Sequence, residues 1–126
     1  GQEVKLSDFY GKAVVINFWA SWCPFCLQEL QDFAKVQEEF KNELVILAIN
    51  RQESKSVAQS YISQRGVEGK MIYLLDPEDV VYHLYGGFGM PVSFFIDGQG
   101  NIQNVKHSQV FLKEIRESVR KLLSES

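Results

Sequence analysis

The chain has two cysteines, Cys23 and Cys26, which lie three positions apart in the stretch WASWCPFC. Such a pair can be half of a zinc site, a structural disulfide or a dithiol that cycles between oxidised and reduced forms. A zinc site needs four ligands at short spacings, but the two histidines, His83 and His107, are far apart in the sequence and are interpreted as surface or helix-end residues. A disulfide between such close residues closes a tiny loop and stabilises little. A redox-active dithiol without metal is the favoured interpretation.

The elements around the cysteines support this interpretation. Residues 13–19 are rich in β-branched and aromatic side chains, which predicts a buried strand with Trp19 in the core. From residue 24 to residue 41, apolar side chains recur every three or four positions, which predicts an amphipathic helix that begins at Pro24. The cysteines therefore lie where a strand ends and a helix begins.

This junction favours thiol–disulfide exchange. At a helix N-terminus, unpaired backbone N–H groups and the helix dipole stabilise a thiolate, so Cys23 is expected to attack a substrate disulfide. Cys26 lies inside the first helical turn, can reach the Cys23 sulfur and is expected to have the less acidic thiol. It would resolve the mixed disulfide and release a reduced substrate, and in reverse the same pair would donate a disulfide.

The rest of the sequence predicts an α/β fold. Strands are predicted at 44–50, 71–75, 91–97 and 101–105, a helix at 54–65, and a short helix or turn at 79–85. A last helix, capped by Ser108, would bury one apolar face, made of Phe111, Leu112, Ile115, Val119, Leu122 and Leu123. This order predicts one domain over residues 1–126, with a mixed sheet and helices on both of its faces.

The composition is that of an ordinary globular protein. The 126 residues are 45% hydrophobic and carry a net charge of -3, and the lysines and arginines form no basic stripe, which argues against a nucleic-acid partner. No apolar run approaches the roughly 18–20 residues of a membrane-spanning helix. The chain begins with Gly1 rather than Met, so we expect the natural N-terminus, and any signal peptide or membrane anchor, to lie outside this sequence.

The stretch FWASWCPFC, residues 18–26, resembles the active-site motif of thioredoxin-fold proteins, and more narrowly that of the TlpA/ResA-type thiol–disulfide oxidoreductases. Residues 4–12 resemble the segment before the first core strand of that family, and residues 90–97 resemble its cis-proline strand. Residues 51–75 match the helix and strand by which this branch exceeds plain thioredoxin. The resemblance implies a thioredoxin fold with an extra N-terminal segment, a central helix–strand insertion and a cis Met90–Pro91 bond.

Two polar residues distinguish the branches of this family. Asn17 stands where cytoplasmic thioredoxins carry a buried aspartate, which favours the TlpA/ResA-type branch, where Glu29 corresponds to an active-site acid. From the residues alone, Glu29 would be a solvated helix glutamate. The resemblance implies instead that it exchanges protons with Cys26, and a buried glutamate would have a raised pKa suited to that task. The pair Pro24-Phe25 between the cysteines is less usual for the branch, which leaves the redox potential open.

The residues around the cysteines predict a protein-binding surface. Trp22 and Phe25 flank the thiols and are expected to be partly exposed, forming with Pro24 an apolar collar that Phe88 and Met90 would extend. The alternative is that these rings close the edge of the core. Pro91 has a plain interpretation as the first residue of a strand, but the resemblance implies that a cis bond leaves the Met90 backbone free to pair with an extended substrate peptide.

The resemblance also implies a setting for the activity. It implies an extracytoplasmic reductase, a monomer without metal or organic cofactor, that receives electrons from an upstream thiol protein. Its substrates would be the cysteines of apocytochrome c or of other exported proteins. Two alternatives stay open: a peroxiredoxin-like peroxidase, although such enzymes carry a threonine where this chain has Ala20, and a redox-inert binding module.

Overall fold

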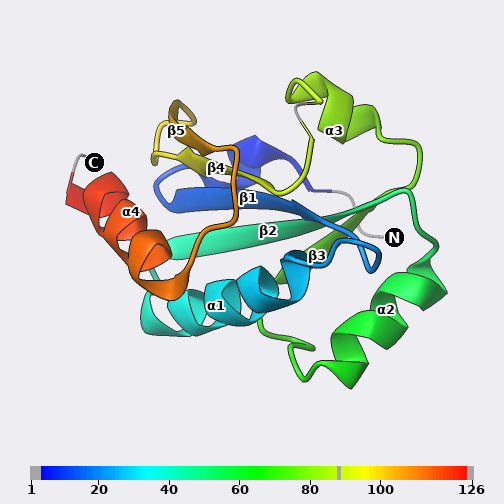
Figure 1. Cartoon of the computed structure of the whole chain (residues 1–126). Coiled ribbons are helices and arrows are strands. Elements are labelled where there is room, and N and C mark those ends of the chain that lie inside the picture. Colours follow the sequence, from blue (N-terminus) through cyan, green and yellow to red (C-terminus); the bar gives the residue numbers. More distant parts are fainter. Residues whose placement is uncertain (1–3, 88, 125–126) are drawn as a thin grey trace.

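The computed structural model describes residues 4–87 and 89–124, which fold around a five-stranded mixed sheet (Figure 1). The strands are β1 (Ala13–Trp19), β2 (Leu44–Arg51), β3 (Ile72–Asp76), β4 (Val92–Ile96) and β5 (Ile102–Lys106). Their order is β3-β2-β1-β4-β5, in which β1, β2 and β3 run parallel while β4 is antiparallel to both of its neighbours. The predicted mixed α/β sheet is confirmed.

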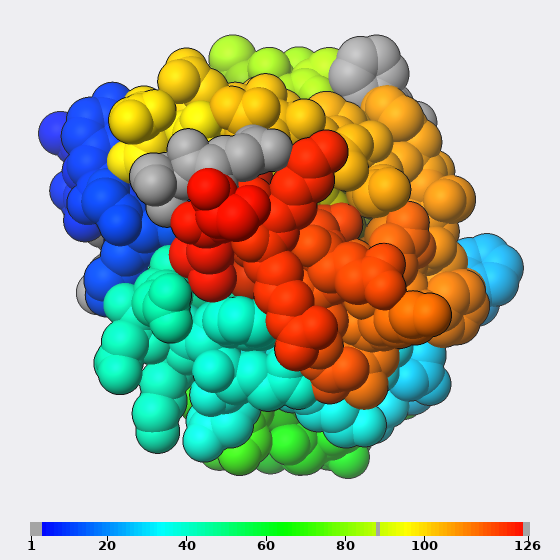
Figure 2. Space-filling view, turned by 90° about the vertical axis from the view of Figure 1, so that its left-hand side faces the viewer, coloured from blue at the N-terminus to red at the C-terminus, as the bar shows by residue number. Residues whose placement is uncertain are grey.

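Helices cover both faces of this sheet, as predicted. They are η1 (Leu6–Phe9), α1 (Cys26–Glu39), α2 (Lys55–Gln64), α3 (Val80–Leu84) and α4 (Leu112–Ser124). Residues of α1, α2 and α4 share one hydrophobic cluster with the sheet, and residues of η1 and α3 share the other. In Figure 2, α4 (red) packs between α1 (cyan) and the hairpin of β4 and β5 (yellow to orange). Within the described residues, no helix is both long and apolar enough to cross a membrane.

The alternation of side chains along β1 determines what lies beneath the helices. Val15 and Trp19 point to the cluster under α1, while Ile16 and Phe18 point to the cluster under α3, because successive side chains of a strand face opposite sides. The same alternation directs Asn17 toward α1. The register of β1 and β4 places Ser93 directly opposite Asn17. A small polar cluster of Asn17 and Ser93 therefore lies inside the core.

Two predictions about the last helix are wrong. The helix begins at Leu112 rather than after Ser108, and Phe111 is 56% exposed instead of lying on the buried face. The reason lies one residue earlier, where Val110 is fully buried and its backbone N–H donates to the carboxylate of Glu29. This contact holds residue 110 in a loop, and the chain turns Phe111 outward before the helix starts. Ile115, Val119 and Leu122 are buried as predicted, and Leu112 and Leu123 are partly buried.

Candidate active site

The two cysteines lie in the turn that leads from β1 into α1. The Cys23 N–H donates to the carbonyl of Ala20 (3.1 Å), and the Cys26 N–H donates to the carbonyl of Cys23 (3.3 Å). These bonds wind residues 20–26 into consecutive turns, so the helix begins at Cys26 and not at Pro24 as predicted. Cys23 lies just ahead of the helix and Cys26 is its first residue. Their sulfurs are joined in a disulfide, and both side chains are buried.

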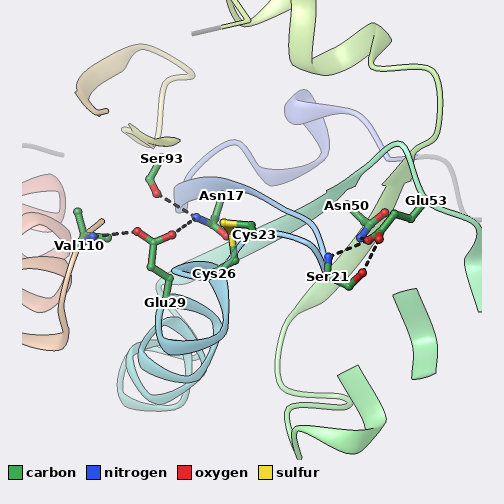
Figure 3. Close-up of a disulfide and its surroundings, with 9 residues drawn as sticks. All are labelled: Asn17, Ser21, Cys23, Cys26, Glu29, Asn50, Glu53, Ser93 and Val110. Atoms are coloured by element: carbon green, nitrogen blue, oxygen red, sulfur yellow. Dashed lines mark hydrogen bonds between the residues drawn. A yellow bond between two sulfur atoms is a disulfide. The ribbon is translucent and has the colours of Figure 1, made fainter. Parts of the chain in front are cut away.

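Glu29 lies one helical turn beyond Cys26 and is completely buried (Figure 3). Its Oε1 accepts a hydrogen bond from Asn17 Nδ2 (3.1 Å), and its Oε2 accepts one from the Val110 N–H (2.8 Å). The Asn17 amide also donates to Ser93 Oγ (3.1 Å). The interpretation of Glu29 as a solvated helix residue is therefore wrong. This interpretation failed because the hydrogen-bond partners of Glu29 come from β1 and from the loop before α4, which are distant from it in sequence.

Burial raises the pKa of Glu29 from its ordinary value of 4.5 to about 7, even though the hydrogen bonds from Val110 and Asn17 favour the charged form. The negative charge of the nearby Asp32 raises it further. A carboxyl group with such a pKa is present in both protonation states near neutral pH. It can therefore take up or release a proton one turn away from the Cys26 sulfur.

A second carboxylate, which the sequence did not single out, holds the turn before Cys23. Glu53 accepts hydrogen bonds from the backbone N–H of Ser21 (2.9 Å), from the Ser21 hydroxyl and from Asn50 Nδ2 (2.8 Å). Partial burial would raise the pKa of Glu53, but these bonds to the charged form outweigh it and lower the pKa below its ordinary value. Figure 3 shows this group on the opposite side of the disulfide from Glu29. In sequence, Glu53 is merely the residue before the Ser54 that caps α2.

The two rings that flank the cysteines in sequence are exposed, as expected for the predicted apolar collar. Trp22 is 53% exposed and Phe25 is 52% exposed, so these rings do not close the edge of the core. Pro24 is exposed between the thiols, Met90 is partly buried and Pro91 is buried. The Met90–Pro91 bond is cis, as the resemblance implied. Phe88, which was expected to extend the collar, lies outside the described residues.

The remaining candidate ligands lie apart from the thiols. His83 is exposed in the last turn of α3, and His107 is exposed in the loop after β5, as predicted for both. Within residues 4–87 and 89–124, no three side chains of His, Cys, Asp or Glu are grouped as a metal site would need.

Comparison with known proteins places the chain in a family. The model of the AhpC/TSA family matches residues 1–105. The thiol–disulfide oxidoreductase ResA of Bacillus subtilis strain 168 is 33% identical over 106 residues, which are 83% of this chain and 58% of that protein. The chain thus matches less than two thirds of the length of this relative.

Solved structures agree with this assignment. The secreted thiol–disulfide isomerase of Corynebacterium glutamicum superposes with a TM-score of 0.87 at 25% identity, over 98% of this chain and 78% of that chain. The exposed lipoprotein thioredoxin of Streptococcus pneumoniae superposes with a TM-score of 0.79 at 26% identity, over 92% and 89% of the two chains. The chain therefore belongs to the AhpC/TSA family of thioredoxin-fold proteins, and within it resembles the thiol–disulfide oxidoreductases of the ResA type.

Proposed function

We propose that this protein is a thiol–disulfide oxidoreductase that reduces disulfides of protein substrates through a mixed disulfide. The observation that carries the proposal is the Cys23–Cys26 disulfide at the strand–helix junction, with the acid Glu29 buried one turn beyond Cys26. The relatives named as thiol–disulfide oxidoreductases and isomerases support the same chemistry.

The geometry supports a two-step exchange that starts from the reduced pair. The Cys23 thiolate attacks one sulfur of a substrate disulfide, a mixed disulfide forms, and the other substrate sulfur leaves as a thiolate. The Cys26 thiol then gives its proton to the Glu29 carboxylate, and the Cys26 thiolate attacks the Cys23 sulfur. The second substrate sulfur leaves as a thiolate. Two electrons pass to the substrate and the Cys23–Cys26 disulfide is formed.

Asn17 can serve both protonation states of Glu29. In the present orientation its Nδ2 donates to Oε1, which suits a carboxylate. Its Oδ1 is buried and meets no hydrogen-bond donor in the described part of the chain. Rotation of the amide would turn this oxygen toward a protonated Glu29, which has an O–H to donate. The amide therefore stabilises the acid before and after it takes the proton from Cys26.

The substrate would lie across the apolar collar of Trp22, Pro24 and Phe25, with its backbone beside Met90 and Pro91. Exposed aromatic side chains next to buried, reactive sulfurs fit a protein surface better than a small polar molecule. We place the protein outside the cytoplasm, because similar proteins are described as secreted and as an exposed lipoprotein. There it would act as a monomer, receive electrons from a thiol protein and reduce exported proteins, of which apocytochrome c is the substrate that the family resemblance implies.

A peroxidase is the less favoured function. Ala20, which stands where peroxiredoxin-like enzymes place a peroxide-orienting threonine, is buried and has no hydroxyl. The nearest hydroxyl in the sequence, that of Ser21, is bonded to Glu53. No side-chain hydroxyl at position 20 is therefore offered to a peroxide.

Insulin reduction in the presence of dithiothreitol tests the proposal. We expect the wild-type protein to accelerate the reduction and Cys23→Ser to be inactive. Reduced Cys26→Ser, mixed with insulin after the dithiothreitol has been removed, should accumulate a mixed disulfide that mass spectrometry detects. Wild-type activity no higher than that of Cys23→Ser would refute the oxidoreductase function. Peroxide consumption by the wild type in the same buffer would favour the peroxidase, and inactivity in both assays would favour the redox-inert module.

A further inference from the structure

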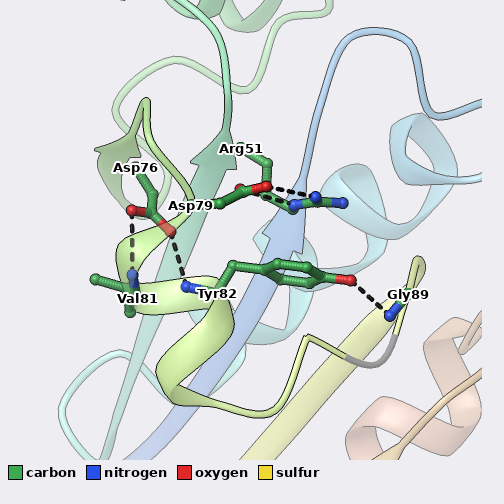
Figure 4. A network of polar contacts seen from close by, with 6 residues as sticks. All are labelled: Arg51, Asp76, Asp79, Val81, Tyr82 and Gly89. Atoms are coloured by element: carbon green, nitrogen blue, oxygen red, sulfur yellow. Dashed lines mark hydrogen bonds and ion pairs between the residues drawn. The ribbon is translucent and has the colours of Figure 1, made fainter.

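Next to the cysteine turn, three side chains from β2, from the turn before α3 and from α3 form one stack, which we call the Arg51 bridge: Arg51, Asp79 and Tyr82 (Figure 4). The Arg51 guanidinium donates to both carboxylate oxygens of Asp79, at 3.0 Å and 2.6 Å. Its central carbon also lies 3.6 Å from the centre of the Tyr82 ring. The two charged side chains are only 12% and 5% exposed. Arg51 is therefore fixed by a planar ion pair and by an aromatic face together.

The Arg51 bridge contacts two segments next to the cysteines, the turn before Cys23 and the loop before Pro91. On one side, the guanidinium carbon lies 5.6 Å from the centre of the Trp22 ring, which is the residue before Cys23. On the other side, the hydroxyl of Tyr82 accepts a hydrogen bond from the backbone N–H of Gly89 (2.5 Å), which is the residue before Met90. One guanidinium thus connects the exposed ring beside the nucleophile to the loop that leads into Pro91.

The base of the bridge is held firmly. The carboxylate of Asp76, at the end of β3, accepts hydrogen bonds from the backbone N–H groups of Val81 (3.2 Å) and Tyr82 (2.8 Å). These bonds fix the start of α3 and therefore the position of the Tyr82 ring. Asp79 has a φ of 59°, a left-handed conformation that aspartate tolerates better than most residues. The backbone of the loop between β3 and α3 thus directs the Asp79 carboxylate toward Arg51.

A buried ion pair is weak evidence for stability, because removing two charges from water costs about as much as their attraction returns. The Arg51–Asp79 pair therefore needs another explanation than stability. Its position offers one, because the guanidinium lies over the Trp22 ring while its aromatic partner Tyr82 accepts a hydrogen bond from Gly89. Both contacts position residues that a bound substrate peptide would contact, Trp22 and Gly89, and neither contact involves a cysteine sulfur.

We propose that Arg51 is a positioning residue. Held by Asp79 and Tyr82, it sets the distance between the Trp22 ring and the loop before Pro91. In this way it selects disulfides carried on an extended protein segment over small disulfides. The inference rests on the proposed oxidoreductase function. It concerns only the binding of the substrate chain, because the Arg51 bridge takes no part in the transfer of protons or electrons.

Single-turnover kinetics of the reduced protein, freed of dithiothreitol and mixed with an excess of disulfide, tests the inference with insulin, a protein disulfide, and Ellman's reagent, a small one. The half-saturating disulfide concentration serves as KM and the limiting rate constant as kcat. For Arg51→Lys, which keeps the charge but loses the planar fork, we expect the KM for insulin to rise about fivefold with kcat unchanged. For Tyr82→Phe, which removes only the acceptor of the Gly89 N–H, we expect a rise of about threefold. The ratio of kcat/KM for insulin to that for Ellman's reagent should fall by the same factors, and the reduction potential of the cysteine pair should stay the same.

Arg116→Lys is the matched control, because Arg116 makes a similar two-pronged contact with Glu39 on the outer surface of α1 and α4. It should leave both KM values and the ratio unchanged. An equal loss with both disulfides, or unchanged kinetics in the two bridge variants, would overturn the inference. If Arg51→Lys does not fold, Tyr82→Phe decides alone, since it removes a single oxygen.

The wild type separates this inference from the proposed function. Reduction of both disulfides, with a preference for insulin that the bridge variants lose, supports the inference. Reduction of both disulfides by the wild type, with kinetics that the bridge variants leave unchanged, would overturn the inference and leave the proposed function intact. A wild-type protein that reduces neither disulfide would overturn the proposed function, and the inference with it.

Discussion

Replacing Glu29 by glutamine should remove a pH dependence from the stability of the oxidised protein. Glu29 is fully buried between two neutral donors, and its pKa is raised from 4.5 to about 7. Because each pKa unit corresponds to about 1.4 kcal/mol, the ionised form costs the folded state about 3 kcal/mol at pH 8. Glutamine has nearly the same shape and keeps an oxygen for the Val110 N–H, but it cannot ionise.

The sign of the effect follows from proton binding in the two states. Between pH 4.5 and pH 7, the folded protein holds a proton on Glu29 that the unfolded chain has released, so rising pH favours unfolding. The stability that protonated Glu29 contributes is complete below pH 4.5 and is lost as the pH passes 7. The unfolding free energy of Glu29→Gln minus that of the wild type should therefore increase by about 3 kcal/mol between pH 4.5 and pH 8.

Urea denaturation of the two oxidised proteins at a series of pH values measures this difference. Subtraction cancels the other carboxyl groups, among them Glu53 and Asp79, whose pKa values are lowered. Glu38→Gln, on the exposed face of the same helix, controls for the loss of one carboxylate. A difference that stays flat from pH 4.5 to pH 8, or that decreases, would show that Glu29 is not held in the environment described here.

Two further predictions concern the turn before Cys23 and the start of α4. Glu53→Gln replaces the charged acceptor of the hydrogen bonds from Ser21 and Asn50, so the unfolding free energy measured in urea at pH 7 should fall by about 2 kcal/mol. An unchanged urea midpoint would mean that other contacts hold the turn. Phe111→Ser should change the unfolding free energy by less than about 0.5 kcal/mol, because this ring is exposed. A loss of about 3 kcal/mol would show instead that the Phe111 ring is buried in the core, as the sequence had predicted.

The elements of the fold could largely be predicted from local patterns. Continuous apolar runs marked β1 and β2, which are buried on both faces, and three-to-four-residue spacing marked α1. Element ends were less certain, since Pro24 and Ser108 are good starting residues for helices that nevertheless begin at Cys26 and Leu112. In both places a tertiary or turn hydrogen bond prevailed over the local preference.

The site could be predicted only in part, because its contacts join residues that are distant in sequence. The cysteines lie three positions apart and were recognisable, but the bond from Val110 to Glu29 spans 81 positions. The pairing of Arg51 with Asp79 spans 28 positions. A glutamate on a helix and an arginine at a strand end are usually exposed, and nothing in their immediate neighbours indicates otherwise.

Three carboxylates hold the elements next to the cysteines or the Arg51 bridge, and their partners give each a different task. Asp79 meets the cation of Arg51 and has a lowered pKa, so it stays ionised and structural. Glu53 is partly exposed, accepts bonds from Ser21 and Asn50 and also has a lowered pKa. Glu29 alone among the three is fully buried with only neutral donors, and its pKa rises to about 7. Of these groups, only Glu29 can change its protonation near neutral pH, and it is the one that shares a helix with Cys26.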